Sequence, residues 1–227
     1  MKGLLTRGLI ALCLPLVATA PAWGVTVLPE LPSLGITITD MSGAVQTFDA
    51  LNLGMSGDFL VTVNGDGTKT LSGHMSMANV WDFMWTLTTN LDPFVTLHTV
   101  ITNTNASTQT FGVATSASVF PPITPSSRMG GDIHATVYDL NSDGSASLSA
   151  PTTGAIYDAR IDGTSVKTMI PPGNGLTYSG TPGGSASFVI PPTFGMPGIT
   201  DPGPAVNSSI GIVDIFQLSG GDKVSAG

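Results

Sequence analysis

The stretch FLVTVNGDGTKTLSGHMSM at residues 59–77 decides the fold class. Apolar side chains take every second position in residues 59–63, and residues 71–77 alternate in the same way. A Gly-Asp-Gly triplet at 65–67 separates the two runs, and glycine supplies the positive φ that tight hairpin turns require. The stretch therefore predicts a β-hairpin.

The same period of two continues along most of the chain beyond this hairpin. Residues 80–89 place Trp81, Phe83 and Trp85 on one face of a further strand. More strands are expected at 94–103, 110–120, 133–140, 145–149, 155–161, 165–170, 185–190 and 208–218. No window of helical length has an apolar stripe with a period of 3.6 residues. About ten short strands joined by turns predict an all-β protein, an antiparallel two-sheet β-sandwich of jelly-roll-like form.

A cluster of prolines at 121–125 interrupts the pattern, because proline cannot donate to a sheet ladder. It is compatible with a domain boundary or with a loop inside one sandwich. We expect a single domain over 25–227, since either half alone has too few strands to bury both sheet faces. Long loops rich in proline and glycine are expected near 171–184 and 191–204.

The N-terminus has the pattern of a secretory signal peptide. Basic residues precede an uncharged apolar run at 8–17, and small residues follow it. Residues 1–24 are therefore expected to be removed, with cleavage after Ala22 or Gly24. The apolar run is shorter than the roughly 20 residues that span a bilayer, so a retained anchor is the less favoured alternative. We expect a secreted protein of the extracellular space or cell surface, with the periplasm as another destination.

Charge and cysteine content limit the partners of the processed chain. Removing Lys2 and Arg7 from the seven basic residues leaves five against 15 acidic ones, a net charge of −10. Such a balance repels nucleic-acid phosphates and anionic membrane surfaces, so neither a nucleic-acid partner nor a membrane span is expected. The single cysteine, Cys13, lies in the signal peptide, which leaves no disulfide or thiolate chemistry. Edge strands with few charges favour self-association.

The sharpest local motif is DLNSDG at 139–144, which matches the first six positions of a calcium-binding loop. Asp139, Asn141 and Asp143 would supply oxygen ligands at positions 1, 3 and 5. Position 12, however, is Ala150 instead of the bidentate glutamate. A turn between two strands explains the same residues, so both interpretations stay open. Calcium is the one cofactor that the sequence suggests.

The aromatic row of Trp81, Phe83 and Trp85 also has two interpretations. On an exposed sheet face, Trp81 and Trp85 would stack against sugar rings. On an inward face, the same rings would fill the core, where large aromatic side chains contribute most of the burial. The polar residues on the opposite face of this strand favour the core.

Catalytic and zinc-binding motifs are missing from the sequence. It contains no G-x-S-x-G, H-E-x-x-H or P-loop pattern. The chain has three histidines, His74, His98 and His134. Their spacing does not suit a metal pair. Glu30 is the only glutamate, so a hydrolase would have to use aspartates such as Asp82 and Asp132.

Several motifs between residues 85 and 222 together suggest a family. They are a tryptophan-containing strand, DPF at 92–94, TVITN at 99–103, NASTQTF at 105–111, FPP at 120–122, GG at 130–131, DLNSDG at 139–144 and FQLSGGD at 216–222. The chain resembles exported bacterial β-sandwich proteins of the type that often carries a PEP-CTERM sorting tail. The tail itself, a Pro-Glu-Pro motif followed by an apolar span and basic residues, does not occur in this sequence. The resemblance implies a further strand after residue 222 and a role in the extracellular matrix or biofilm.

Three functional hypotheses follow from the sequence. The first is an exported, non-enzymatic structural or adhesive protein of the bacterial cell surface or matrix, with polysaccharide or another matrix protein as partner. The second is a carbohydrate-binding module that uses Trp81 and Trp85, or the loop at 171–184. The third is a secreted hydrolase.

Overall fold

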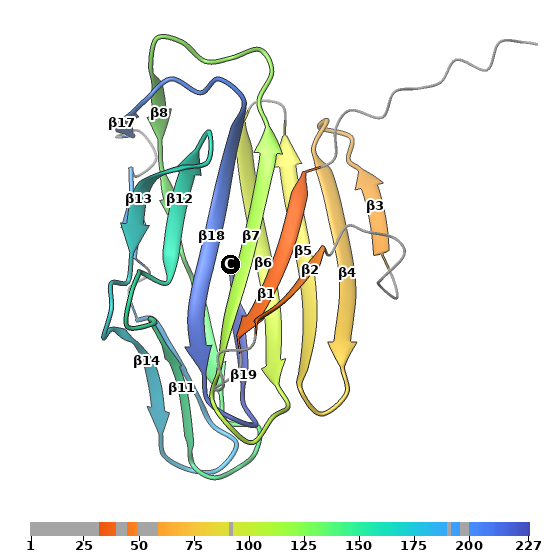
Figure 1. Cartoon of the computed structure of the whole chain (residues 1–227), viewed down its shortest axis with the longest axis vertical. Helices are drawn as coiled ribbons and strands as arrows, with labels where there is room; N and C mark the ends of the chain where they lie inside the picture. Colours follow the sequence, from red (N-terminus) through yellow and green to blue (C-terminus); the bar gives the residue numbers. More distant parts are fainter. Residues whose placement is uncertain (1–31, 40–44, 50–58, 91–92, 190–191, 196–199) are drawn as a thin grey trace, which may run out of the picture.

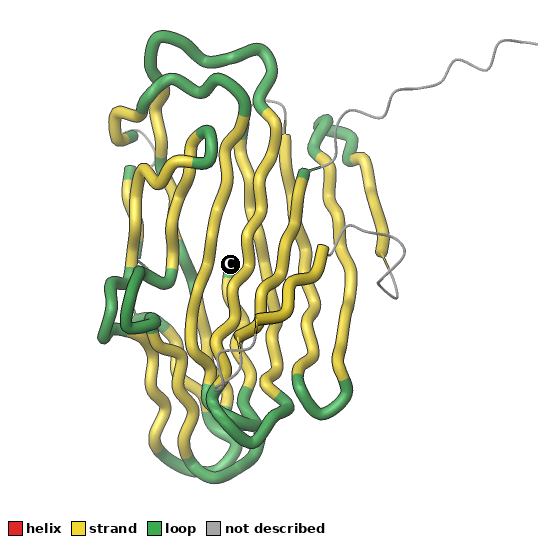
Figure 2. The backbone as a smooth tube through the Cα atoms, viewed as in Figure 1, coloured by secondary structure: helices red, strands yellow, loops and turns green. Residues whose placement is uncertain are grey.

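The computed structural model describes residues 32–39, 45–49, 59–90, 93–189, 192–195 and 200–227. The predicted signal peptide and both cleavage positions lie outside these residues. All regular secondary structure in the described part is β-strand (Figure 2). In the same ranges, no helix is present that could span a membrane.

The larger sheet has the strand order β13-β12-β18-β7-β1-β2, and β11 joins it by pairing with β18 and β14. Its strands are β1 (Ser33–Thr39), β2 (Val45–Asp49), β7 (Gln109–Ser118), β11 (Ser145–Ser149), β12 (Tyr157–Ile161), β13 (Thr164–Met169), β14 (Gly175–Ser179) and β18 (Ser209–Leu218). Each of its neighbouring pairs is antiparallel.

The second sheet has the order β15-β10-β19-β6-β5-β4-β3. Its strands are β3 (Phe59–Val63), β4 (Lys69–Met77), β5 (Trp81–Asn90), β6 (Phe94–Asn103), β10 (Ala135–Tyr138), β15 (Ser185–Ser187) and β19 (Lys223–Ala226). Two small sheets pair β8 (Ser127–Met129) with β17 (Asp201–Gly203), and β9 (Gly131–Asp132) with β16 (Thr193–Phe194). The two large sheets lie face to face (Figure 1), which confirms the predicted β-sandwich.

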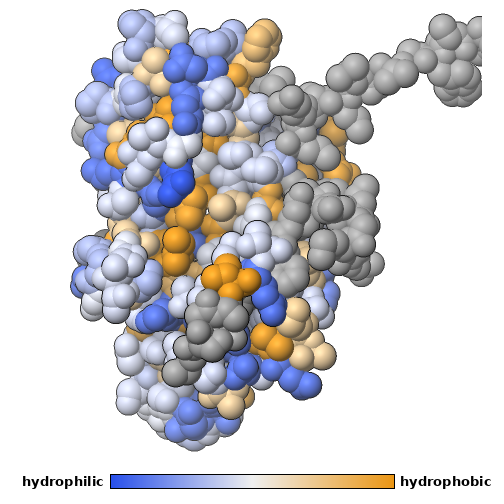
Figure 3. All heavy atoms as spheres, viewed as in Figure 1, coloured by the Kyte–Doolittle hydropathy of each residue, from blue (hydrophilic) through white to orange (hydrophobic). Residues whose placement is uncertain are grey.

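The core forms because alternate residues of the strands point between the sheets. On β5 the inward side chains of Trp81, Phe83, Trp85 and Leu87 are buried, and the residues between them are at least partly exposed. The larger sheet contributes residues such as Phe111 and Phe216, whose ring centres lie 6.0 Å apart. The outer face of the larger sheet is mainly polar, with smaller hydrophobic areas near its middle (Figure 3).

Several strands fall outside the predicted set. The expected loop at 171–184 contains β14, and the expected loop at 191–204 contains β16 and β17. Each of these strands has at most five residues, too few to show a clear alternation of apolar and polar side chains. The strand expected after residue 222 is present as β19. Each large sheet contains strands from before and after the prolines at 121–125, so the described residues form one sandwich.

Close packing against Trp85 predicts that Gly73 is intolerant of a side chain. The two residues face each other across β4 and β5, and a Cβ at Gly73 would lie 2.2 Å from the Trp85 ring. We expect Gly73→Ala to lower the free energy of unfolding, measured in urea, by about 1–3 kcal/mol. Gly35→Ala in β1 is the matched control, since no atom lies within 4 Å of its added Cβ. Equal stability of the two variants would contradict this packing.

Candidate functional site

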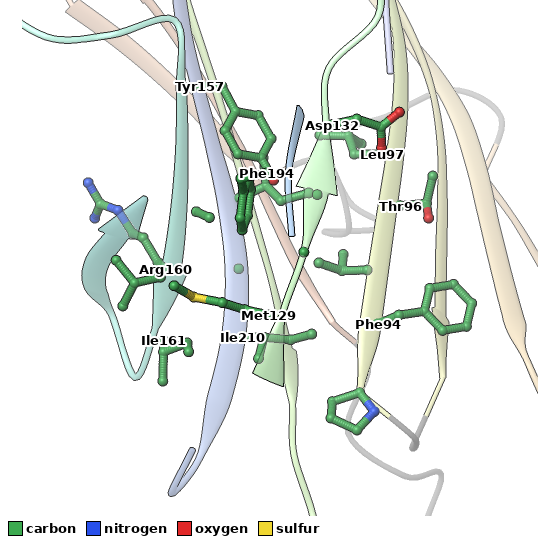
Figure 4. Close-up of a pocket in the computed structure, with 18 of the residues that line it drawn as sticks. Phe94, Thr96, Leu97, Met129, Asp132, Tyr157, Arg160, Ile161, Phe194 and Ile210 are labelled. Atoms are coloured by element: carbon green, nitrogen blue, oxygen red, sulfur yellow. The ribbon is translucent and has the colours of Figure 1, made fainter. Parts of the chain in front are cut away.

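A cavity of about 260 Å³ lies between the large sheets, next to β12, β18 and the beginning of β6. Tyr157 and Phe194 lie close together on one side, and Leu97, Thr96 and Phe94 lie on β6 across from them (Figure 4). Buried members of the lining, such as Ile161, are continuous with exposed ones, such as Phe94. The cavity therefore opens to solvent.

Most of the cavity wall is apolar. The hydrophobic side chains that line it include Leu97, Ile123, Met129, Ile161, Val166, Val206, Ile210, Ile212 and Phe194. A mainly hydrophobic concave surface with a few polar groups is the usual composition of a small-molecule site.

One buried polar residue of this wall is Asp214. Along β18 it follows Ile212 and precedes Phe216 on the inward face of the strand, and only 9% of the residue is exposed. It lies directly opposite Tyr157 on β12 and Val113 on β7. A carboxyl group therefore occupies a position on the core face where the alternation of the sheet calls for an apolar side chain.

The surroundings of Asp214 disfavour its charge. Among the described residues no hydrogen bond to its Oδ1 atom is found, although this atom is fully buried. Burial raises the pKa of Asp214 from its ordinary value of 3.8 to about 7. Since each pKa unit corresponds to about 1.4 kcal/mol, keeping this carboxylate ionised in the fold costs on the order of 4 kcal/mol.

Tyr157 stands beside Asp214 in a tightly packed place. A Cβ at Gly131 would lie 3.0 Å from the Tyr157 hydroxyl and 2.8 Å from the Phe194 ring, so only glycine fits there without a shift. Burial raises the pKa of Tyr157, and the negative charges of Asp214, Asp132 and Asp158 raise it further. Three carboxylates thus produce a negative potential at the Tyr157 hydroxyl.

Two of the cations near the cavity are paired with carboxylates, whereas Arg128, which lines it, donates to the backbone carbonyl of Thr200. Arg160 Nε donates to Asp158 Oδ2 at 2.8 Å, and Lys167 Nζ lies 3.5 Å from Asp201 Oδ2. A second buried polar atom on the wall, Ser127 Oγ, has no hydrogen-bond partner among the described residues. Two residues of the lining, Asp214 and Ser127, thus each have a buried polar atom without a hydrogen-bond partner in the described part of the chain.

Asp162 fixes the segment that leads into β18, and so the position of the cavity wall. Its carboxylate accepts backbone N–H groups from Asn207, Ser208 and Ser209 at 2.8 to 3.0 Å. These hydrogen bonds hold the pKa of Asp162 well below its ordinary value. The β12–β13 turn is thereby tied to the start of β18.

The residues of the predicted calcium loop form a closed turn in the structure. Asp139 accepts backbone N–H groups of Asp143, Gly144 and Gly183, and the Asn141 side chain donates to Asp143 and to the backbone of Gly220. These hydrogen bonds are the ones expected if the motif forms a turn between two strands. Within the described ranges no group of three or more His, Cys, Asp or Glu could hold a metal ion. Calcium binding at Asp139, Asn141 and Asp143 stays a prediction.

The structure places Trp81 and Trp85 in the core, the interpretation that the sequence favoured, and not on a sugar-stacking surface. Both are 2% exposed and lie inside the sandwich, because the strand turns its aromatic face toward the core. Asp82 and Asp132, proposed for a hydrolase, lie on β5 and β9, two strands of different sheets. Each is bonded to a histidine of its own at 2.8 Å, Asp82 to His74 and Asp132 to His134.

The sequence analysis missed Asp214, although the pattern around it contains a signal. Residues 210, 212, 216 and 218 were expected on one apolar face, and Asp214 interrupts that face at its centre. A charged residue at an inward position of a strand with otherwise apolar partners is rare enough to single out a functional residue.

Comparison with protein-family models, with curated proteins and with solved structures gave no match. The assignment of a function therefore depends on the geometry of the cavity.

The raised pKa of Asp214 predicts an unusual dependence of stability on pH. Between about pH 4 and pH 7 the folded state holds the Asp214 proton more tightly than the unfolded state, so this group lowers the free energy of unfolding as the pH rises. Above about pH 7 the free energy of unfolding no longer decreases because of this group. We expect Asp214→Asn to remove this decline, so that its stability relative to the wild type increases by up to about 4 kcal/mol from pH 4 to pH 8.

Urea unfolding of the wild type and of Asp214→Asn at a series of pH values measures this difference. Thr86→Ala, which changes no titratable group on the outward face of β5, is the control and should keep the wild-type pH profile. A constant difference between wild type and Asp214→Asn across the range would show that Asp214 titrates normally.

Proposed function

We propose that this chain is an exported, non-enzymatic protein of the bacterial cell surface or extracellular matrix that binds a small, mainly apolar molecule in the cavity beside β12 and β18. The observation that carries the proposal is a solvent-connected cavity with a mainly apolar wall that includes the buried residue Asp214. The buried carboxyl group of Asp214 does not stabilise the fold, because an apolar residue of similar size at this position would give a more stable protein.

The volume of the cavity supports a small ligand. A dry apolar cavity of about 150 Å³ holds benzene, and sites for drug-sized molecules range from about 300 to 1,000 Å³. At about 260 Å³ this cavity suits one ring with a short substituent. It is too small for an oligosaccharide, so the carbohydrate-binding alternative gains no support from it.

The proposed location depends on the sequence. The N-terminal signal pattern, the net charge of −10 after processing and the lack of cysteine in the processed chain all suit an extracellular protein. The resemblance to exported bacterial β-sandwich proteins supports the cell surface or matrix.

Filling the cavity tests the proposal. Ala159 lines it from β12, pointing to the same side as Ile212 on β18. We expect ligand-observed NMR with a set of one-ring aromatic compounds to detect binding to the wild type and not to Ala159→Phe. Ala114→Phe on the exposed face of β7 is the control and should bind as the wild type does. Binding retained by Ala159→Phe, or absent from the wild type, would refute the cavity as the site.

A structural or adhesive role is a second candidate, favoured by the exposed apolar residues of β3. This edge strand has β4 as its only partner among the described residues. Leu60 is 62% exposed, Val61 40% and Val63 69%. An edge strand of this composition pairs readily with another strand, from a second copy or from another matrix component.

Substitution of a charged residue into the edge strand β3 tests this second role separately from ligand binding. We expect Val63→Lys to weaken self-association, because edge lysines oppose strand pairing. Val189→Lys is the control, since Val189 is 96% exposed and lies outside the strands of both large sheets. Sedimentation velocity over a concentration series measures the effect. Equal association of wild type and both variants would remove β3 as an assembly surface.

A further inference from the structure

We infer that the Asn174-Gly175 pair, in the turn that leads into β14, is a site of spontaneous deamidation that yields aspartate and isoaspartate. The sequence contains two Asn-Gly pairs, at 64–65 and 174–175, and the structure distinguishes them. The inference is independent of the ligand-binding cavity, because it depends only on this turn and on the strand β11 beside it (Figure 1).

The reaction needs no enzyme and consumes only water. The backbone nitrogen of the glycine attacks the Cγ atom of the preceding asparagine, and its proton leaves with the side-chain nitrogen as ammonia. Water then opens the resulting succinimide ring at either of its two carbonyl groups. One opening gives aspartate, and the other gives isoaspartate, whose main chain is one carbon longer. Glycine favours ring closure because it has no Cβ to hinder the approach.

The attacking nitrogen of Gly175 has no hydrogen-bond acceptor to hold it. Gly175 lies opposite Ser149 of β11, and the Ala150 N–H donates to the Asn174 carbonyl oxygen at 2.9 Å. In an antiparallel ladder this arrangement makes Ser149 and Gly175 a non-hydrogen-bonded pair, so the Gly175 N–H points away from β11. Among the described residues β11 is the only strand paired with β14, and Gly175 is exposed. Solvent therefore reaches the residue that must lose its proton.

The side chain of Asn174 is held only weakly. It is exposed, and its Nδ2 atom donates to the carbonyl oxygens of Pro171 and Pro172 at 3.2 and 3.4 Å. These distances lie at or beyond the long end of the usual range for N–H···O hydrogen bonds. The amide can therefore turn toward Gly175 at little cost in hydrogen bonding.

Asn64, the asparagine of the other pair, is held more firmly. It is half-buried in the β3–β4 hairpin, and its Nδ2 atom donates to the hydroxyl groups of Thr68 and Thr70 at 2.7 and 3.0 Å. Turning the Asn64 amide toward Gly65 would break both of these shorter hydrogen bonds. We therefore expect the fold to protect Asn64 and to leave Asn174 reactive.

Packing explains why glycine follows Asn174. A Cβ at Gly175 would lie 2.0 Å from the Leu148 carbonyl oxygen and 2.7 Å from the Ser149 Cα atom. Both contacts are with backbone, so no side chain fits at this position unless β11 or β14 moves. A bulkier residue, which would slow ring closure, cannot be accommodated here.

Isoaspartate at position 174 would also change the start of β14. The Asn174 carbonyl oxygen accepts the Ala150 N–H, and an extra main-chain carbon displaces this oxygen relative to β11. We expect the Ala150 amide hydrogen to exchange faster with solvent in the isoaspartate form, separated by ion exchange, than in the unmodified protein. An unchanged exchange rate would contradict this effect on the strand pairing.

Incubation of the folded protein at pH 8 and 37 °C tests the site itself. Peptide mass spectrometry after digestion follows both Asn-Gly pairs, because each conversion raises the peptide mass by about 1 Da. We expect conversion at Asn174 to be at least tenfold faster than at Asn64. Asn174→Gln should lose the fast reaction, and Asn64→Gln should keep it.

The same incubation in urea is the matched control for the role of the fold. Once the chain is unfolded, the two pairs should convert at similar rates. Conversion at Asn64 as fast as at Asn174 in the folded protein would overturn the inference, and so would an intact Asn174 after several weeks. A preference for Asn174 that persists unchanged in urea would also overturn it, because sequence neighbours and not the fold would then select the site.

Discussion

A β-strand directs alternate side chains to opposite faces of its sheet, and the fold of this chain depends on burying one of those faces between two sheets. Trp81, Phe83 and Trp85 fill the space from one side, and Phe111 and Phe216 from the other. At an inward position, an apolar side chain therefore stabilises the fold more than a polar one does. Asp214 on β18 and Gln109 on β7 depart from this pattern, because each is a buried polar residue with a buried oxygen that has no hydrogen-bond partner in the described structure.

The cavity forms where the regular sandwich gives way to the small sheets. Residues of β8, β9 and β16 line it beside those of β6, β12 and β18, so the wall combines regular strands with backbone rich in glycine. Gly131 allows the chain to approach Tyr157 and Phe194 closely, and the Asp162 carboxylate holds the start of β18. Rigid strands thus position Asp214 and Tyr157, and short connecting segments close the cavity around them.

Much of this fold could be predicted from alternation alone. The strands β3 to β7 and β18 were expected close to their observed bounds, since long runs with a period of two have few other solutions. Short strands such as β16 and β17 were not, because their pairing is set by distant partners. The favoured interpretation of Trp81 and Trp85 as core residues is confirmed, since the polar residues on the opposite face of their strand indicated which face is covered. The sequence contains a signal for Asp214, which interrupts an apolar strand face. That Tyr157 lies opposite Asp214 depends on the pairing of β12 with β18, which only the structure supplies.

The account rests on a carboxyl group that holds its proton near neutral pH because the fold provides no partner for it. Carbon-13 NMR of the aspartate side-chain carboxyl carbons follows this proton directly, with Asp214→Asn identifying the resonance. The account predicts a titration midpoint for Asp214 near pH 7 in the ligand-free protein. A midpoint near pH 4, as for an exposed aspartate, would contradict it.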